Sequence, residues 1–149
     1  MPAVQAAVIA AVVIGTLWTS GCSGAEPSAV TPASEEVSPD AVDACALLSA
    51  EDVEAVIGVP FDGVPSGVGG RSECRWENPD TGESVTVEIG GPGTAVGLDG
   101  TRIVAGTVEF AAGGRCNSVR VATAADESSD EAVAAALRLI ERIRPQMSD

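Results

Sequence analysis

Residues 73–89 decide the fold, and they read ECRWENPDTGESVTVEI. Apolar and polar side chains alternate near both ends of this stretch, a pattern that indicates two half-buried strands. The segment NPDTG between them has strong turn chemistry, because proline presets φ and glycine accepts a left-handed backbone. The stretch therefore predicts an antiparallel hairpin, with Cys74 and Trp76 facing inward and Arg75 and Glu88 facing outward.

Four strands are expected in all, at residues 73–77, 84–89, about 102–110 and about 117–123. The segment AAGGR at 111–115 joins the third and fourth strands as a second hairpin. Gly106 lies inside the third strand and suggests a β-bulge there. The segment 90–100 is rich in glycine and is predicted to be a connecting loop.

A helix is predicted ahead of the first hairpin, over residues 50–57. Ser49 is a good N-cap, and Asp52 three residues later approximates a capping box. Gly58 and Pro60 end this helix, because glycine suits the C-terminal cap and proline cannot continue a helix.

A second helix is predicted over about residues 128–144, with Ser128 and Glu131 as its capping box. Its buried stripe is expected to consist of Val133, Leu137, Ile140 and Ile143. The predicted fold class is therefore α+β, with an antiparallel sheet of four to five strands and two helices packed on one face.

The N-terminus has the features of an export signal. Residues 3–18 form an apolar run that is short for a bilayer-spanning helix, which needs about 20 residues, but suits a signal peptide. The small residues TSG directly before Cys22 resemble the bacterial lipobox. That resemblance implies that residues 1–21 are a cleaved lipoprotein signal peptide and that the Cys22 sulfur carries a diacylglycerol. An uncleaved anchor helix and ordinary secretion are the alternatives.

Residues 23–40 are rich in proline, serine and glutamate and show no apolar period. This composition predicts a flexible tether that spans roughly 25 Å on average. Residues 41–149 then form a single α+β domain, which the lipid on Cys22 anchors at the outer face of the cytoplasmic membrane.

Four cysteines in an exported chain favour disulfide chemistry. Their positions contain no C-x-x-C pair, which argues against a zinc site. Cys74 is expected to face inward and Cys45 lies in an apolar setting, whereas Cys116 falls on the outward parity of its strand. These positions favour a Cys45–Cys74 disulfide, with Cys74–Cys116 as the alternative.

The sequence DACALLS at 43–49, followed by CRW at 74–76, resembles the actinobacterial lipoproteins grouped as domain of unknown function 3558. The family pattern is D-P-C-x-L-L followed by serine or threonine, then a helix and C-x-W, after a lipobox and a tether. The resemblance covers about residues 40–145, with Ala44 in place of the usual proline. It implies a location and a fold, and the family carries no assigned activity.

Composition disfavours several classes of function. The chain has 22 carboxylates, eight bases and a net charge of −14, so nucleic acid is a poor partner. Without histidine or lysine it has no Ser-His-Asp or Cys-His pair, no Schiff-base lysine and no histidine metal site. The segment 90–97 does not open a helix as a phosphate loop does, and 126–131 lacks the ligand spacing of a calcium loop. We therefore expect no catalytic residue, no cofactor and no metal.

Arg75, Arg120 and Glu88 are expected on one open sheet face and are the candidates for an interaction surface. Cross-strand ion pairs with Glu77, Glu88 or Glu109 are the simpler explanation of the arginines. The sequence therefore predicts a lipid-anchored, non-catalytic module that binds an envelope protein or a cell-wall partner. The alternative is a small-ligand-binding or carrier lipoprotein, which requires an apolar pocket between the helices and the sheet.

Overall fold

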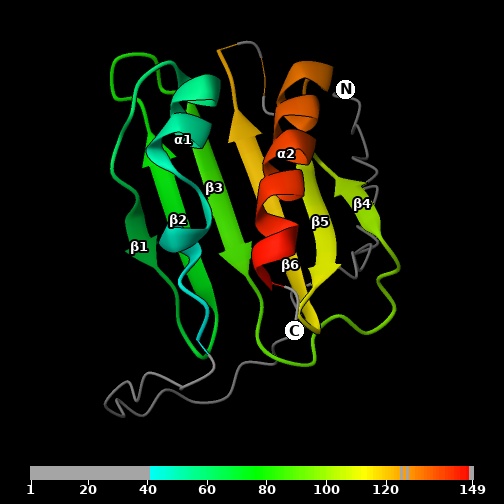
Figure 1. Ribbon diagram of the computed structural model, residues 1–149. Helices are drawn as coiled ribbons and strands as arrows, with labels where there is room; N and C mark the ends of the chain where they lie inside the picture. The colour runs from blue at the N-terminus through cyan, green and yellow to red at the C-terminus, as the bar shows by residue number, and fades with distance from the viewer. Residues whose placement is uncertain (1–40, 125, 127, 148–149) are drawn as a thin grey trace, which may run out of the picture.

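The computed structural model describes residues 41–124, 126 and 128–147, which form one open antiparallel sheet with two α-helices on one face (Figure 1). The strands are β1 (Val64–Ser66), β2 (Ser72–Glu77), β3 (Ser84–Ile89), β4 (Thr101–Val104), β5 (Thr107–Ala112) and β6 (Arg115–Ala122), in the sheet order β1-β2-β3-β6-β5-β4. The helices are α1 (Ala50–Ile57) and α2 (Asp130–Ile143), with the 3-10 helices η1 (Ala44–Leu47) and η2 (Arg144–Met147). The predicted α+β class is confirmed, with six strands in place of four to five.

The hairpin predicted from residues 73–89 is formed by β2 and β3. Trp76 pairs with Val85, and both side chains are buried on the side of the sheet that the helices cover. In the turn, Gly82 donates its N–H to the carbonyl oxygen of Asn78 at 2.7 Å. Gly82 has a φ of 76°, a conformation that glycine adopts without steric cost.

The single strand predicted over 102–110 is wrong, because two strands occupy this region and its continuation. β4 and β5 are joined by Ala105 and Gly106, whose φ values of 48° and 80° are both positive. Positive φ at both central residues is typical of a type I′ hairpin turn, which matches the twist of the strands that it joins. Gly106 is thus a turn residue and not a β-bulge, and β4 becomes an edge strand. The sequence also gives no signal for β1, which has three residues including Pro65.

Helix α1 begins and ends as predicted. Ser49 accepts the backbone N–H of Asp52, and the Asp52 carboxylate accepts the backbone N–H of Ser49, which completes the capping box. Gly58 closes the helix in the left-handed conformation. Val53 and Ile57 are fully buried and attach α1 to the sheet.

Helix α2 differs from the prediction in its start and in its buried side. Its N-cap is Ser129, one residue after the predicted Ser128. Leu137, which was expected in the core, is 39% exposed. The buried residues are Ala132, Ala135, Ala136, Leu139, Ile140 and Ile143. The alanines let the helix lie close to β6 and β5, and this orientation places Leu137 on the side toward β4.

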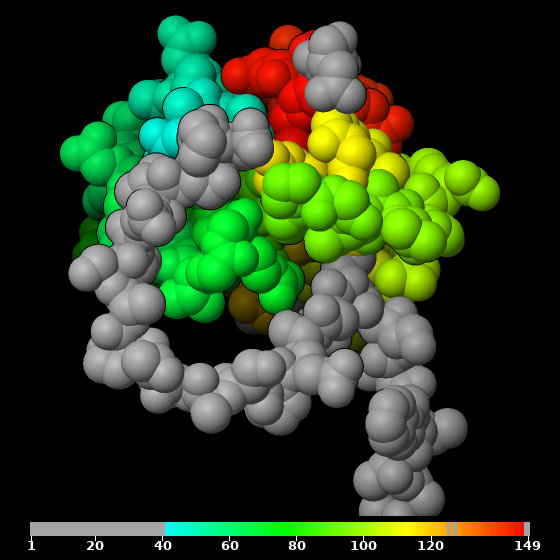
Figure 2. Space-filling model, turned by 90° about the horizontal axis from the view of Figure 1, so that it is seen from below, coloured from blue at the N-terminus to red at the C-terminus, as the bar shows by residue number. Residues whose placement is uncertain are grey.

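An apolar core fills the space between the sheet and the helices. Valine, isoleucine and leucine side chains pack there around Phe110 and Trp76, which are 0% and 3% exposed. In Figure 2 the cyan segment that contains α1 and the red end of α2 lie side by side on one side of the molecule. The sulfur atoms of Cys45 and Cys74 lie at bonding distance, which agrees with the expected disulfide and links η1 to β2. Closing this loop contributes roughly 3–4 kcal/mol in the chain-entropy model.

Residues 1–40 lie outside the described residues, and with them the expected signal peptide, the expected lipidation site Cys22 and the expected tether. None of the described helices has the length and hydrophobicity that a membrane span requires. Lipid anchoring therefore stays a prediction.

Candidate functional site

The side of the sheet opposite the helices, here called the helix-free face, carries side chains from all six strands. Strand register arranges these side chains in rows that cross the sheet. One row consists of Val64, Arg75, Thr86, Arg120, Thr107 and Val104. The neighbouring row consists of Ser66, Glu73, Glu88, Ser118, Glu109 and Arg102. The face is therefore mostly polar and carries charges of both signs, with the exposed Val64 and Val104 at its two edges.

The three residues predicted to form an interaction surface all lie on the helix-free face. Arg75 and Arg120 are exposed and flank Thr86 in one row. Two strand spacings put their Cα atoms about 10 Å apart. Glu88 lies in the neighbouring row and is half-buried. Each residue points as the strand pattern predicts, and its role in binding stays a prediction.

Ion pairs on this face explain several of its arginines, although the Arg75–Glu77 pair lies along β2 and is not the expected cross-strand pair. The pairs are Arg71–Glu88, Arg75–Glu77 and Arg102–Glu109. The Arg75–Glu77 pair is 2.8 Å long, and its two side chains are 47% and 49% exposed. Pairs with this much exposure contribute little to stability, because water and salt screen them. Their charges stay accessible to a partner.

A hollow of about 220 Å³ lies on the helix-free face, and no sequence pattern predicted it. Its lining residues are Arg71, Glu88, Val104, Thr107, Glu109, Cys116, Asn117 and Ser118. Cys116 faces this side of the sheet and Cys74 faces the other, which explains why the alternative Cys74–Cys116 disulfide is not formed. The lining comes from separate strands, so it becomes visible only once the strand order is known.

The glycine-rich segment 90–100 is a loop, as predicted, and its first residues pack against β6. A Cβ atom on Gly90 would lie 2.2 Å from the carbonyl oxygen of Cys116, so a larger residue does not fit without movement. The Thr94 hydroxyl accepts the N–H of Cys116 at 2.9 Å, and Arg115 donates to the carbonyl oxygen of Gly90 at 2.9 Å. These contacts give the loop a structural role.

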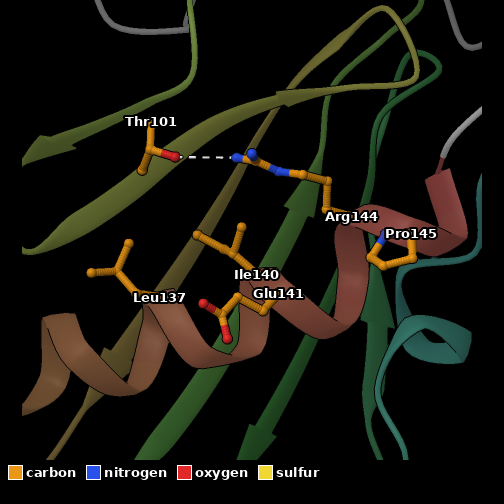
Figure 3. Close-up of a pocket in the computed structure, with 6 residues that line it drawn as sticks. All are labelled: Thr101, Leu137, Ile140, Glu141, Arg144 and Pro145. Carbon is orange, nitrogen blue, oxygen red and sulfur yellow. Dashed lines mark hydrogen bonds between the residues drawn. The ribbon is translucent and has the colours of Figure 1, made fainter.

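An apolar groove of about 690 Å³ lies between α2 and β4 (Figure 3). Leu137, Ile140 and Pro145 form its apolar lining. At one end Arg144 donates to the Thr101 hydroxyl at 3.1 Å, and its guanidinium lies 5.8 Å from the centre of the Phe110 ring. Sequence reasoning missed this groove because it placed Leu137 in the core.

Two carboxyl groups in the described part of the chain have lowered pKa values, and both lie close to helix starts. Hydrogen bonds from the hydroxyl and N–H of Ser49 hold the pKa of Asp52 below its ordinary value. Hydrogen bonds from the N–H and hydroxyl of Ser128 lower the pKa of Asp126 in the same way. Among the described residues, no group of three or more histidine, cysteine, aspartate or glutamate side chains is placed to hold a metal ion.

Comparisons of the chain with protein-family models, curated proteins and solved structures gave no match. The likeness to the lipoproteins grouped as domain of unknown function 3558 rests on the residues quoted above and stays a prediction.

Proposed function

We propose that this chain is a lipid-anchored extracytoplasmic protein that binds an envelope protein or a cell-wall partner through its helix-free face and catalyses no reaction. The observation that carries the proposal is the difference between the two faces of the sheet. Apolar side chains fill one face beneath the helices. The other face presents Arg75, Thr86 and Arg120 in one row, and no described helix covers it.

An open antiparallel face suits docking, because a rigid scaffold holds its side chains in fixed positions. Arginine binds carboxylates and phosphates through two parallel hydrogen bonds. Arg75 and Arg120 place two guanidinium groups in one row of a chain of net charge −14, and the exposed Glu77 is the ion-pair partner of Arg75. We therefore expect the partner to present anionic groups to this row.

Catalysis has little support from the chemistry of the chain. It lacks histidine and lysine, which supply many general bases and activated nucleophiles. The lowered pKa values of Asp52 and Asp126 follow from hydrogen bonds that cap local structure. Neither carboxyl group is among the residues that line the hollow of the helix-free face.

The groove between α2 and β4 supports a second candidate, a small-ligand carrier. Its volume falls within the usual range of ligand sites, roughly 300–1,000 Å³. The carrier is the weaker proposal because the groove lies at the surface, while the space between the helices and the sheet is filled. Binding of a fluorescent apolar probe that is lost in a Leu137→Asp variant would favour the carrier.

The anchoring part of the proposal predicts that Cys22→Ala moves the protein from the membrane fraction into the medium, because the lipid is the expected anchor. Immunoblots of fractionated cells measure the distribution. Retention of the variant in the membrane fraction with its leader attached would contradict lipid anchoring and favour an uncleaved anchor helix.

The binding part predicts that the double substitution Arg75→Glu and Arg120→Glu abolishes partner capture, because it reverses the charge of the row. Crosslinking in isolated envelopes, followed by pull-down and mass spectrometry, measures capture of the same identified protein or wall fragment. Circular dichroism checks that the double variant is folded.

Arg138→Glu is the matched control, because Arg138 is an exposed arginine on α2. We expect this control to keep wild-type capture. Equal capture by the wild type and the double variant would contradict a binding role for the helix-free face. Hydrolysis by the purified domain that a carboxylate substitution removes would contradict the absence of catalysis.

A further inference from the structure

The two edge strands of the sheet differ in how open they are to pairing. β1 has three residues, and Pro65 lies in its middle. Proline has no N–H to donate, so it is a common device for blocking a sheet edge. β4 contains no proline, and its four residues are all exposed. The β4 edge is therefore the one that can accept another strand.

The hydrogen bonds of β4 show which of its backbone groups face outward. Ala111 on β5 donates its N–H to the carbonyl oxygen of Gly100 at 3.3 Å. Hydrogen-bonded positions alternate along an antiparallel pair, so Arg102 also bonds to β5. The N–H and C=O groups of Thr101 and Ile103 consequently point away from β5. Among residues 41–124, 126 and 128–147, no hydrogen-bond partner is found for these four groups, which form a row at the edge of the sheet.

Exposed apolar side chains lie beside this row. Ile103 is 55% exposed and Val104 is 37% exposed. Leu137 is 39% exposed and lines the groove next to β4. Apolar surface next to unpaired backbone groups favours the addition of a strand, because both can be covered by one contact.

We propose that the β4 edge pairs with the β4 edge of a second copy of this chain. The antiparallel register places Thr101 opposite Ile103 of the second copy and is centred on Arg102. This register satisfies all four unpaired backbone groups in each copy, which a register shifted along the strand does not. The two sheets become continuous, and the apolar side chains of Ile103 and Leu137 extend from both copies toward the shared edge.

The charges near the centre of this contact are compatible with two identical copies. Arg102 of one copy lies beside Arg102 of the other on the helix-free face. Each guanidinium is already paired with Glu109 of its own chain, through a hydrogen bond from Nε of 2.7 Å and a second contact from Nη2. The row Glu109–Arg102–Arg102–Glu109 therefore sums to zero charge, and the arginine repulsion is reduced.

The contact is small. A ladder of this length buries less than the roughly 1,200–2,000 Å² of a stable complex. We therefore expect weak, concentration-dependent association. Copies that share a membrane would meet at raised local concentration. The strand pairing itself does not depend on the proposed function and can be tested without a membrane.

Cysteine variants of the purified full chain test the register. Opposed residues in the proposed ladder have Cα atoms about 5.5 Å apart, within disulfide reach. Two copies of Thr101 are offset by about 7 Å along the strand, which places their Cα atoms about 8 Å apart, beyond the roughly 7 Å limit for a disulfide. We expect a mixture of Thr101→Cys and Ile103→Cys chains to give a covalent dimer under mild oxidation. Neither variant alone should form this dimer.

The wild type and Val64→Cys are the controls, because Val64 is 67% exposed on the β1 edge and reports on chance collisions. Dimer yields from the mixture that match those of Val64→Cys would overturn the proposal. The β4 edge would then be open to pairing with a strand of another protein. A dimer from Ile103→Cys alone at the yield of the mixture would also overturn it. Failure of partner capture by the Arg75 and Arg120 variants would leave these results unaffected.

Discussion

The two faces of this sheet are built from the same strands, yet the side chains of one face pack in the core and those of the other face carry polar and charged groups. On β3, Val85 and Val87 are fully buried, whereas Thr86 and Glu88 between and beside them are partly exposed. The covered face needs only apolar side chains of suitable volume, which many combinations of valine, isoleucine and leucine supply. The helix-free face instead carries charged groups whose positions follow from the strand register.

This difference separates stability from surface chemistry. Burial against the helices supplies most of the free energy of folding, because it removes apolar area from water. The exposed ion pairs of the helix-free face supply little. Substitutions of the exposed residues on that face therefore change what the surface can bind while leaving the fold in place, which makes a binding role accessible to experiment.

The largest loss of stability is expected at Phe110, which is fully buried on the covered face. We expect Phe110→Ala to lower the free energy of unfolding by about 3–5 kcal/mol, because it leaves a cavity in the core. Thr107→Ala, on the same strand but on the helix-free face, is the matched control and should cost less than about 1 kcal/mol. Urea unfolding followed by Trp76 fluorescence measures both, and equal losses would contradict the difference between the faces.

A smaller effect is expected at Ser49, which caps the helix α1 on the covered face. Ser49→Ala should lower the free energy of unfolding by about 1 kcal/mol at pH 7. The pKa of Asp52 is lowered in the folded protein by its hydrogen bonds with Ser49. Its contribution is therefore present above the unfolded pKa and is lost as the pH falls through the folded pKa.

We therefore expect the difference between wild type and Ser49→Ala to shrink in urea titrations at acidic pH. Asp52→Asn is the matched variant, and it should remove this pH dependence because it cannot ionise. A difference that stays constant from pH 7 to strongly acidic pH would show that the capping hydrogen bonds do not depend on the Asp52 charge.

Elements whose ends are marked by nearby capping or turn residues could be predicted from the sequence. The start and end of α1 follow from Ser49 and Gly58, and the β2–β3 hairpin follows from strict alternation around a strong turn. The β4–β5 turn could not be predicted in the same way, because Ala105 is an unusual residue for a positive φ. Strand alternation continued across it and concealed the turn.

The candidate site was predictable to the extent that it depends on alternation along a strand. Arg75, Glu88 and Arg120 could be assigned outward positions without knowing which strands are neighbours. The groove could not be predicted, because it joins Thr101 to Arg144, which are 43 positions apart in the sequence. Its existence depends on the alanine-rich side of α2 facing the sheet, which apolar periodicity alone did not distinguish from the side with Leu137.

The smallest effect is expected at Glu88, which pairs with Arg71 on the helix-free face. These two side chains are 34% and 36% exposed, so water and salt screen their attraction. Glu88→Gln keeps the size of the side chain and a hydrogen-bond acceptor but removes the charge. We expect it to lower the free energy of unfolding by less than about 1 kcal/mol, and the difference should decrease as salt is added to the urea titration. A loss of about 2 kcal/mol or more, insensitive to salt, would show that Glu88 contributes to stability as a core residue does. It would contradict the proposal that the covered face supplies the stability and the helix-free face does not. With the small loss that we expect, any change in partner capture by Glu88→Gln reports on binding, because the fold is preserved.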